Sequence, residues 1–125
     1  MKARKFIAVL AITISGIAAT TSVATAAERT PTKVTIKGNN GDFYGYVKSA
    51  DAANCADERQ VTLFEMLGAT PDPKTDRKVV TDTASPNGSK YMWSAGNTGE
   101  QSGHFYARVK KTDYCGGAIS KVVEP

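Results

Sequence analysis

Short apolar runs rich in Val, Thr, Ile, Phe and Tyr alternate with clusters of Gly, Pro, Asn, Asp and Ser from residue 33 onward. Runs of this length and composition, bounded by turn residues, predict β-strands, and no segment beyond the first 26 residues has a convincing helical pattern. Strands so spaced are typical of an all-β, seven-stranded antiparallel β-sandwich. We expect them at 33–37, 42–48, 59–66, 78–82, 90–94, 103–110 and 118–123.

Several of these segments alternate residue by residue, so that one face of the strand can lie on a core. In 103–110 the expected core face carries Phe105, Ala107 and Val109, whereas Tyr106 lies on the other face. The remaining side chains that we expect in the core are Phe43, Val47, Val61, Leu63 and Trp93.

Three connections between the expected strands have clear turn chemistry. The segment 68–77 contains two prolines and cannot continue a central strand. The segment 85–89 contains Asn87 and Gly88, which tolerate the positive φ angles of a hairpin turn. The segment 94–103 is rich in glycine and is expected to be a longer loop.

Residues 1–26 have the features of a signal peptide. Three basic residues precede an uncharged apolar run of fourteen residues, which is too short for a stable membrane span. Ala24, Thr25 and Ala26 then fit the small-residue pattern that a signal peptidase cleaves, with Ala27 as the next choice. The alternative is an uncleaved N-terminal anchor.

Cleavage after Ala26 divides the chain into a leader, a short N-terminal extension at 27–32 and a β-sandwich domain at 33–125. No cysteine directly follows the apolar run, so a lipid-modified N-terminus is not expected. We therefore expect a secreted, extracellular protein that is not attached to a membrane in its mature form.

The chain contains two cysteines, Cys55 and Cys115. In an oxidising extracellular setting, an even number of cysteines in a small domain indicates a disulfide, and only one pairing exists here. The bridge would close a loop of about sixty residues, worth roughly 4 kcal/mol in the chain-entropy model. A zinc site is disfavoured because two cysteines and one histidine cannot fill four positions.

The net charge of +4 belongs largely to the leader. Three of the 16 Lys and Arg residues lie there, so 13 remain against 12 Asp and Glu, a net charge of +1. A balance so close to neutral gives no support to binding of nucleic acid or of an anionic membrane.

The segments VVTDTASPNGSKYMWSA (79–95) and SGHFYARV (102–109) resemble transthyretin-like (prealbumin-like) sandwiches and carboxypeptidase regulatory-like domains. The resemblance extends over residues 33–123 and implies an Ig-like or prealbumin-like sandwich. The chain is also similar to small secreted bacterial proteins with one cysteine before a VTLF-like strand and another after a YARV-like strand. The hydroxyisourate hydrolases of the transthyretin-like group use several histidines and a Tyr-Arg-Gly-Ser tail, which this chain lacks.

Candidate catalytic and metal-binding residues are few. His104 is the single histidine, and strand alternation points it outward near a loop. Ser102, His104 and Asp113 could form a serine–histidine–aspartate set on paper, but no motif in the sequence supports one. Asp72, Asp76 and Asp82 could surround calcium, but their spacing matches no calcium loop. We expect no catalytic residue, no metal and no cofactor.

The outward-facing tyrosines are the main candidates for a contact surface. Tyr44, Tyr46 and Tyr106 are expected to leave the core face of two strands, where tyrosines commonly bind a protein or a glycan. The interpretation that we favour for these rings is that they pack across strands and cover the sheet's own outer face. The strand pattern, the expected disulfide and the lack of a catalytic constellation make the leading hypothesis a secreted, non-enzymatic binding or structural module whose partner is an unidentified extracellular protein or glycan.

Two other functions stay open from the sequence. A small secreted hydrolase would use His104 as its acid or base. A secreted inhibitor or toxin-like protein would act through a surface loop, at 68–77 or 94–103.

Overall fold

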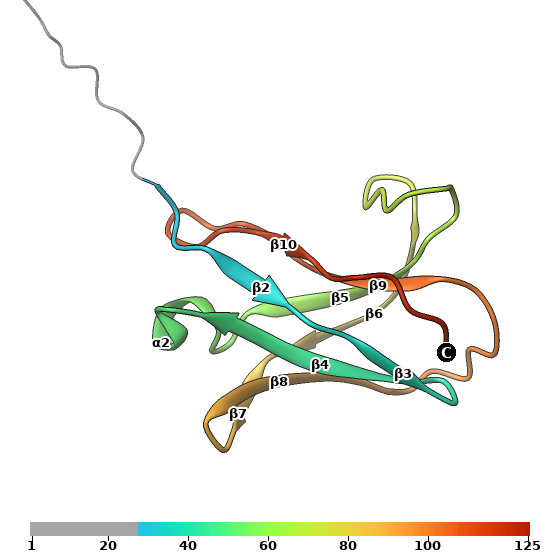
Figure 1. Cartoon of the computed structure of the whole chain (residues 1–125), viewed down its shortest axis with the longest axis horizontal. Coiled ribbons are helices and arrows are strands. Elements are labelled where there is room, and N and C mark those ends of the chain that lie inside the picture. Colours follow the sequence, from blue (N-terminus) through green and yellow to red (C-terminus); the bar gives the residue numbers. More distant parts are fainter. Residues whose placement is uncertain (1–27) are drawn as a thin grey trace, which may run out of the picture.

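The computed structural model describes residues 28–125, and the expected signal peptide lies outside this range. The described chain forms two antiparallel sheets that face each other (Figure 1). The first sheet has the order β2–β4–β8–β7, with β3 also paired to β4, and the second has the order β10–β9–β5–β6. The all-β, antiparallel prediction is confirmed.

The strands of the first sheet are β2 (Thr32–Val34), β3 (Lys37–Asn39), β4 (Asp42–Ser49), β7 (Ser85–Asn87) and β8 (Lys90–Asn97). Those of the second sheet are β5 (Gln60–Glu65), β6 (Arg77–Thr83), β9 (Phe105–Val109) and β10 (Ala118–Ile119). One short helix, α2 (Ala52–Cys55), lies between β4 and β5.

The count of strands differs from the seven expected: nine are present in residues 28–125. The expected strand 33–37 is divided into β2 and β3, and β7 is an additional short strand that forms a hairpin with β8 around Gly88. The strand β8 runs on to Asn97, so the loop that we placed at 94–103 begins later. The helix α2 was not predicted, because four residues are too few to produce a helical period.

The division between β2 and β3 has a specific cause at Thr35. Its carbonyl turns away from the strand ladder and accepts the indole N–H of Trp93 at 2.9 Å. The backbone N–H of Tyr46 is left without that carbonyl and donates instead to the Thr35 hydroxyl at 2.9 Å. The Thr35 carbonyl and the Tyr46 N–H, which no longer bond to each other, thus each have another partner, as buried backbone groups require.

Gly45 is what allows this break. It lies opposite Trp93 on β8, and a Cβ atom at this position would overlap the carbonyl oxygen of Thr35 and crowd the Trp93 indole. The chain between β2 and β3 can therefore approach β4 closely only because residue 45 has no side chain.

The core lies between the sheets and contains the residues that the alternation predicted. Phe43 and Phe105 face each other from the two sheets with ring centroids 4.8 Å apart. Trp93 is 1% exposed although it is the largest side chain present, so it fills the centre of the sandwich. The other predicted core residues in this cluster are Val47, Val61, Leu63, Ala107 and Val109.

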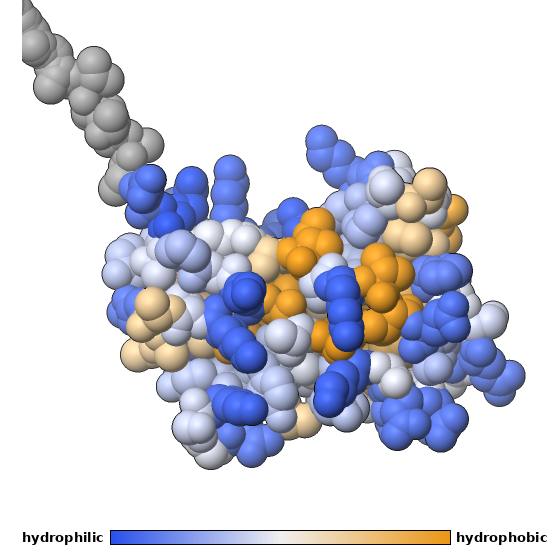
Figure 2. Space-filling view, in the orientation of Figure 1, coloured by the Kyte–Doolittle hydropathy of each residue, from blue (hydrophilic) through white to orange (hydrophobic). Residues whose placement is uncertain are grey.

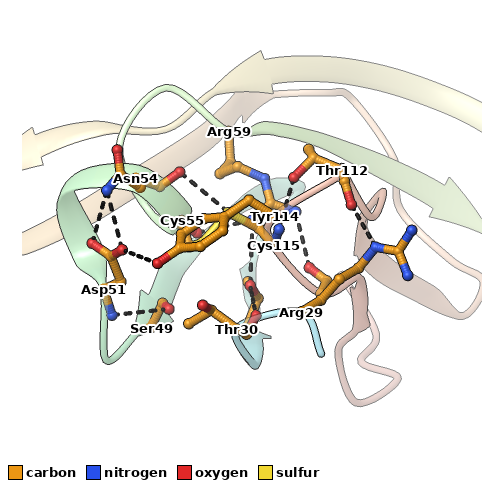
Figure 3. The surroundings of a disulfide bond; sticks show 12 residues. Arg29, Thr30, Ser49, Asp51, Asn54, Cys55, Arg59, Thr112, Tyr114 and Cys115 are labelled. Carbon is orange, nitrogen blue, oxygen red and sulfur yellow. Dashed lines mark hydrogen bonds between the residues drawn. A yellow bond between two sulfur atoms is a disulfide. The ribbon is translucent and has the colours of Figure 1, made fainter. Parts of the chain in front are cut away.

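The disulfide between Cys55 and Cys115 is present, with the two Cα atoms 5.5 Å apart. It joins α2 to the loop between β9 and β10, and both cysteines are buried. Figure 3 shows that the start of the described chain also enters this region. Thr30 pairs with Cys115, and Arg29 donates to the carbonyl of Thr112 at 2.6 Å.

Arg59 is buried beside the disulfide and holds the same segments together (Figure 3). Its guanidinium donates to the carbonyls of Cys55, Lys110 and Gly116 and to the hydroxyl of Thr32, at 2.6–3.3 Å. Burial lowers the pKa of Arg59 from its ordinary value of 12.5. Neutral acceptors satisfy this cation, and within residues 28–125 no carboxylate forms an ion pair with it.

Replacing both cysteines by alanine should lower the free energy of unfolding by about 4 kcal/mol, because the unfolded chain loses its constraint. Urea unfolding followed by the fluorescence of Trp93, the single tryptophan, measures the change. A reducing agent should bring the wild-type midpoint close to that of the double variant and leave the variant itself unchanged. Equal midpoints for the oxidised wild type and the variant would contradict the prediction.

Gly45→Ala should lower the free energy of unfolding by about 1–3 kcal/mol, because the new methyl group meets backbone and forces it to move. Gly68→Ala is the matched control, since no heavy atom lies within 4 Å of an added Cβ there. The same urea titration compares the two variants. The explanation given for the break at Thr35 fails if both behave like the wild type.

Candidate binding face

The outer face of the first sheet carries an ordered set of tyrosines and lysines. We use the name tyrosine–lysine face for Lys33, Lys37, Tyr44, Tyr46, Lys48 and Lys90. The β4 register places Tyr44 opposite Lys37 on one side and Ser94 on the other, and Tyr46 opposite Met92. The core residues Phe43 and Val47 alternate with these tyrosines, which is why both rings point outward.

A hollow of about 630 Å³ lies on this face, within the size range of ligand sites. Four other hollows described on the surface measure about 280–460 Å³. Thr35, at the strand break, and Gly45 are among the residues that line it. Its lining residues are Val34, Thr35, Ile36, Lys37, Tyr44, Gly45, Tyr46, Lys48, Lys90 and Lys121.

Figure 2 shows hydrophilic side chains standing beside an apolar area in the region where Figure 1 draws β10 and the C-terminal segment. Lys121 belongs to that segment and brings a fourth cation to the hollow, beside Lys37, Lys48 and Lys90. None of the ten lining residues is acidic. The hollow therefore combines half-buried aromatic rings with positive charge.

Lys90 and Tyr46 contact each other directly. The Lys90 ammonium lies 4.9 Å from the centroid of the Tyr46 ring, a cation–π geometry that holds both side chains over the sheet. Tyr44 and Tyr46 are half-buried, so each ring keeps a part of its surface open to a partner. The prediction that these two tyrosines face outward is confirmed.

The expectation for Tyr106 was wrong: its side chain is fully buried. It does leave the core face of β9, but the segment 66–76 folds back over it. Its ring stacks on Phe64 with centroids 5.3 Å apart, and its hydroxyl donates to Asp76 at 2.6 Å. The sequence identifies 68–77 as a loop but contains no signal for the direction in which that loop folds.

Asp76 fixes the segment 66–76 over Tyr106. Besides the Tyr106 hydroxyl, its carboxylate accepts the backbone N–H groups of Leu67 at 2.9 Å and Asp72 at 2.7 Å. Burial on its own raises the pKa of Asp76, but the hydrogen bonds from Leu67, Tyr106 and Asp72 outweigh it and hold the pKa below the ordinary 3.8. Burial, and then the hydrogen bond to Asp76, raises the pKa of Tyr106 above its ordinary value of 10.0.

His104 points outward as predicted, with 58% of its side chain exposed, and its Nε2 lies 3.6 Å from Glu124. It precedes the first residue of β9, whereas Asp113 follows the end of that strand, in the loop that carries Cys115. The length of β9 therefore separates His104 from Asp113, and the structure does not assemble the set formed on paper with Ser102.

Of the three aspartates considered for calcium, Asp72 and Asp76 lie in one turn, whereas Asp82 lies apart on β6. Asp76 is engaged with Tyr106, whereas Asp82 accepts the backbone N–H of Ser94 at 2.8 Å. Asp72 accepts the N–H of Lys74. Residues 28–125 contain no group of three or more His, Cys, Asp or Glu side chains that could hold a metal ion.

Within the described range, no helix is both long enough and apolar enough to cross a membrane.

Asp76→Asn should destabilise the protein at neutral pH and remove part of its sensitivity to acid. Because the folded pKa of Asp76 is depressed, its contribution is complete above about pH 4, the unfolded pKa, and is lost as the pH falls through the folded value. The raised pKa of Tyr106 has the opposite sign, so its contribution is complete below about pH 10 and is lost in stronger alkali. Thermal unfolding between pH 2 and 11 measures how stability changes on the acid side and on the alkaline side.

Asp113→Asn is the matched control for this measurement, because Asp113 is exposed. Tyr106→Phe should flatten the alkaline limb and leave a folded protein. An Asp76→Asn variant with the wild-type acid profile would show that this carboxylate does not hold the segment 66–76.

Comparisons of the chain with models of protein families, with curated proteins and with solved structures find no match. The function is therefore inferred below from the residues of this chain alone.

Proposed function

We propose that the chain is a secreted, non-enzymatic binding module that holds an extracellular partner on the tyrosine–lysine face. The observation that carries the proposal is the hollow over Tyr44 and Tyr46, with rings that are half-buried and outward-facing. Secretion is supported by the signal-peptide pattern and by a buried disulfide, a bond typical of oxidising compartments.

Tyrosines on a sheet are suited to this task. Each ring offers apolar area and a hydroxyl while having only two side-chain torsions to fix on binding. The strand β4 lies between β2 and β8, and its inner face packs against the core through Phe43 and Val47. Side chains mounted on such a rigid element are pre-organised, which lowers the cost of binding.

We further propose that the sandwich is of the Ig-like type. One sheet has the order β2–β4–β8 and the other β10–β9–β5, which corresponds to the A–B–E and G–F–C strands of that fold. The strand β6 pairs with β5 and so extends the second sheet, as an additional C′ strand does. The disulfide differs from that of antibody domains, because it joins α2 to a loop instead of crossing the core. The transthyretin-like resemblance stays a prediction.

Truncation of the two tyrosines tests the proposed face. An array of neutral and acidic glycans, together with extracellular proteins, should contain a ligand for the oxidised wild type. Tyr44→Ala/Tyr46→Ala should weaken binding of that ligand by about 700-fold, because central aromatic contacts are each worth about 2 kcal/mol and two are lost.

Tyr114→Ala is the matched control: Tyr114 is 55% exposed but lies beside the disulfide, away from the hollow. It should bind like the wild type. The proposal fails if the wild type binds nothing on the array, or if removal of Tyr44 and Tyr46 leaves binding unchanged.

A further inference from the structure

Three lysines form a row across the first sheet. Lys33 on β2 and Lys48 on β4 are direct partners in the strand register. Val47 on β4 pairs with Tyr91 on β8. Because the strands are antiparallel, the residue after Val47 lies beside the residue before Tyr91, which places Lys48 beside Lys90. Neighbouring strands are about 4.8 Å apart. Like charges directly opposite each other on a sheet destabilise it, so the row costs the fold free energy.

No carboxylate of the described chain neutralises this row. The ion pairs within residues 28–125 involve Arg77 with Glu65 and Glu100, and His104 with Glu124. Of the Lys and Arg side chains in residues 28–125 only Arg77 forms an ion pair, so what distinguishes Lys33, Lys48 and Lys90 from the other lysines is that they lie next to one another. The net charge beyond the leader is only +1, so the positive face is a local concentration of charge and not a reflection of the whole chain.

The tyrosines lie among the lysines. Along β4 the order is Tyr44, Tyr46, Lys48, with Lys37 opposite Tyr44 and the Lys90 ammonium over the Tyr46 ring. A sugar ring has an apolar C–H face that packs on an aromatic ring. A carboxylate or sulfate on the same sugar then meets an ammonium group, so one acidic saccharide satisfies both kinds of side chain.

An acidic peptide fits this face less well. Extended peptides commonly join a sheet by adding a strand to a free edge. Of the two edges of this sheet, the chain leading into β2 already pairs through Thr30 with the loop that carries Cys115, and the other edge is the three-residue strand β7. The aromatic and cationic groups lie on the broad surface of the sheet instead, where a flexible chain of sugars can rest.

We infer that the ligand of the tyrosine–lysine face is an acidic polysaccharide, whose carboxylate or sulfate groups bind Lys48, Lys90 and their neighbours while its sugar rings pack on Tyr44 and Tyr46. This inference rests on the proposed function and adds the chemical class of the ligand.

Calorimetry with defined polymers tests the inference. The probes are heparin (sulfated), polygalacturonate (carboxylated), neutral dextran, polyglutamate and single-stranded DNA. We expect binding to at least one of the two acidic polysaccharides, weakened by added salt because the contacts are exposed, and no binding to dextran. Preference for heparin or for polygalacturonate identifies the acidic group.

Lys48→Gln/Lys90→Gln should reduce the affinity on the order of tenfold, since two exposed charge contacts are lost. Its unfolding midpoint should equal or exceed that of the wild type, because like-charge repulsion is relieved; lost binding then does not reflect lost folding. Lys110→Gln/Lys111→Gln is the control, with the same charge change at exposed residues beyond β9. It should bind like the wild type.

Two results would overturn the ligand class and keep the proposed face. The first is binding of dextran that depends on the tyrosines and is unchanged by the lysine substitutions. The second is binding of polyglutamate or DNA that is as strong as binding of the acidic polysaccharides. Equal losses in the two lysine variants would show unspecific charge attraction and overturn the inference as well. Absence of binding to every probe, and to the glycans and proteins of the array, would refute the proposed function with it.

Discussion

The hydrogen bond from the Trp93 indole to the Thr35 carbonyl determines the shape of the first sheet. It draws Thr35 toward the core, which divides the edge strand into β2 and β3, both of which pair with β4. Gly45 leaves room for the Thr35 carbonyl, and the Thr35 hydroxyl replaces that carbonyl as the acceptor of the Tyr46 N–H. The wall of the hollow at Val34, Thr35 and Ile36 is a direct consequence.

At the α2 end of the sandwich, a covalent bond and a buried charged group add to the apolar packing. The disulfide joins α2 to the loop after β9, and the buried Arg59 donates to acceptors from several of the segments that meet there. A small domain buries a modest share of its surface, so such added constraints matter to it. They also keep β2 in place, because Thr30 and Thr32 take part in the same contacts.

The sequence predicted the core well because strand alternation is a local property. The period of two along each strand, together with one face to bury, was enough to place these side chains in the core: Phe43, Leu63, Trp93 and Phe105. Tyr106 was misassigned because its burial depends on a loop that returns from 66–76 and on Asp76, which is distant in sequence. The break at Thr35 was missed for the same reason, since Trp93 lies 58 residues away. The lysine row likewise depends on strand register, which composition does not reveal.

The two outer faces of the sandwich differ in whether their polar side chains have partners within the protein. On the second sheet Tyr106 and Asp76 are buried and satisfy each other, so neither of these two groups is free for a partner. On the first sheet Lys33, Lys48 and Lys90 lie side by side and exposed, an arrangement that weakens the sheet and has no carboxylate partner within residues 28–125. Proteins retain such local conflicts mainly where a site requires them. The proposed anionic partner would remove this conflict, and its binding would then stabilise the fold.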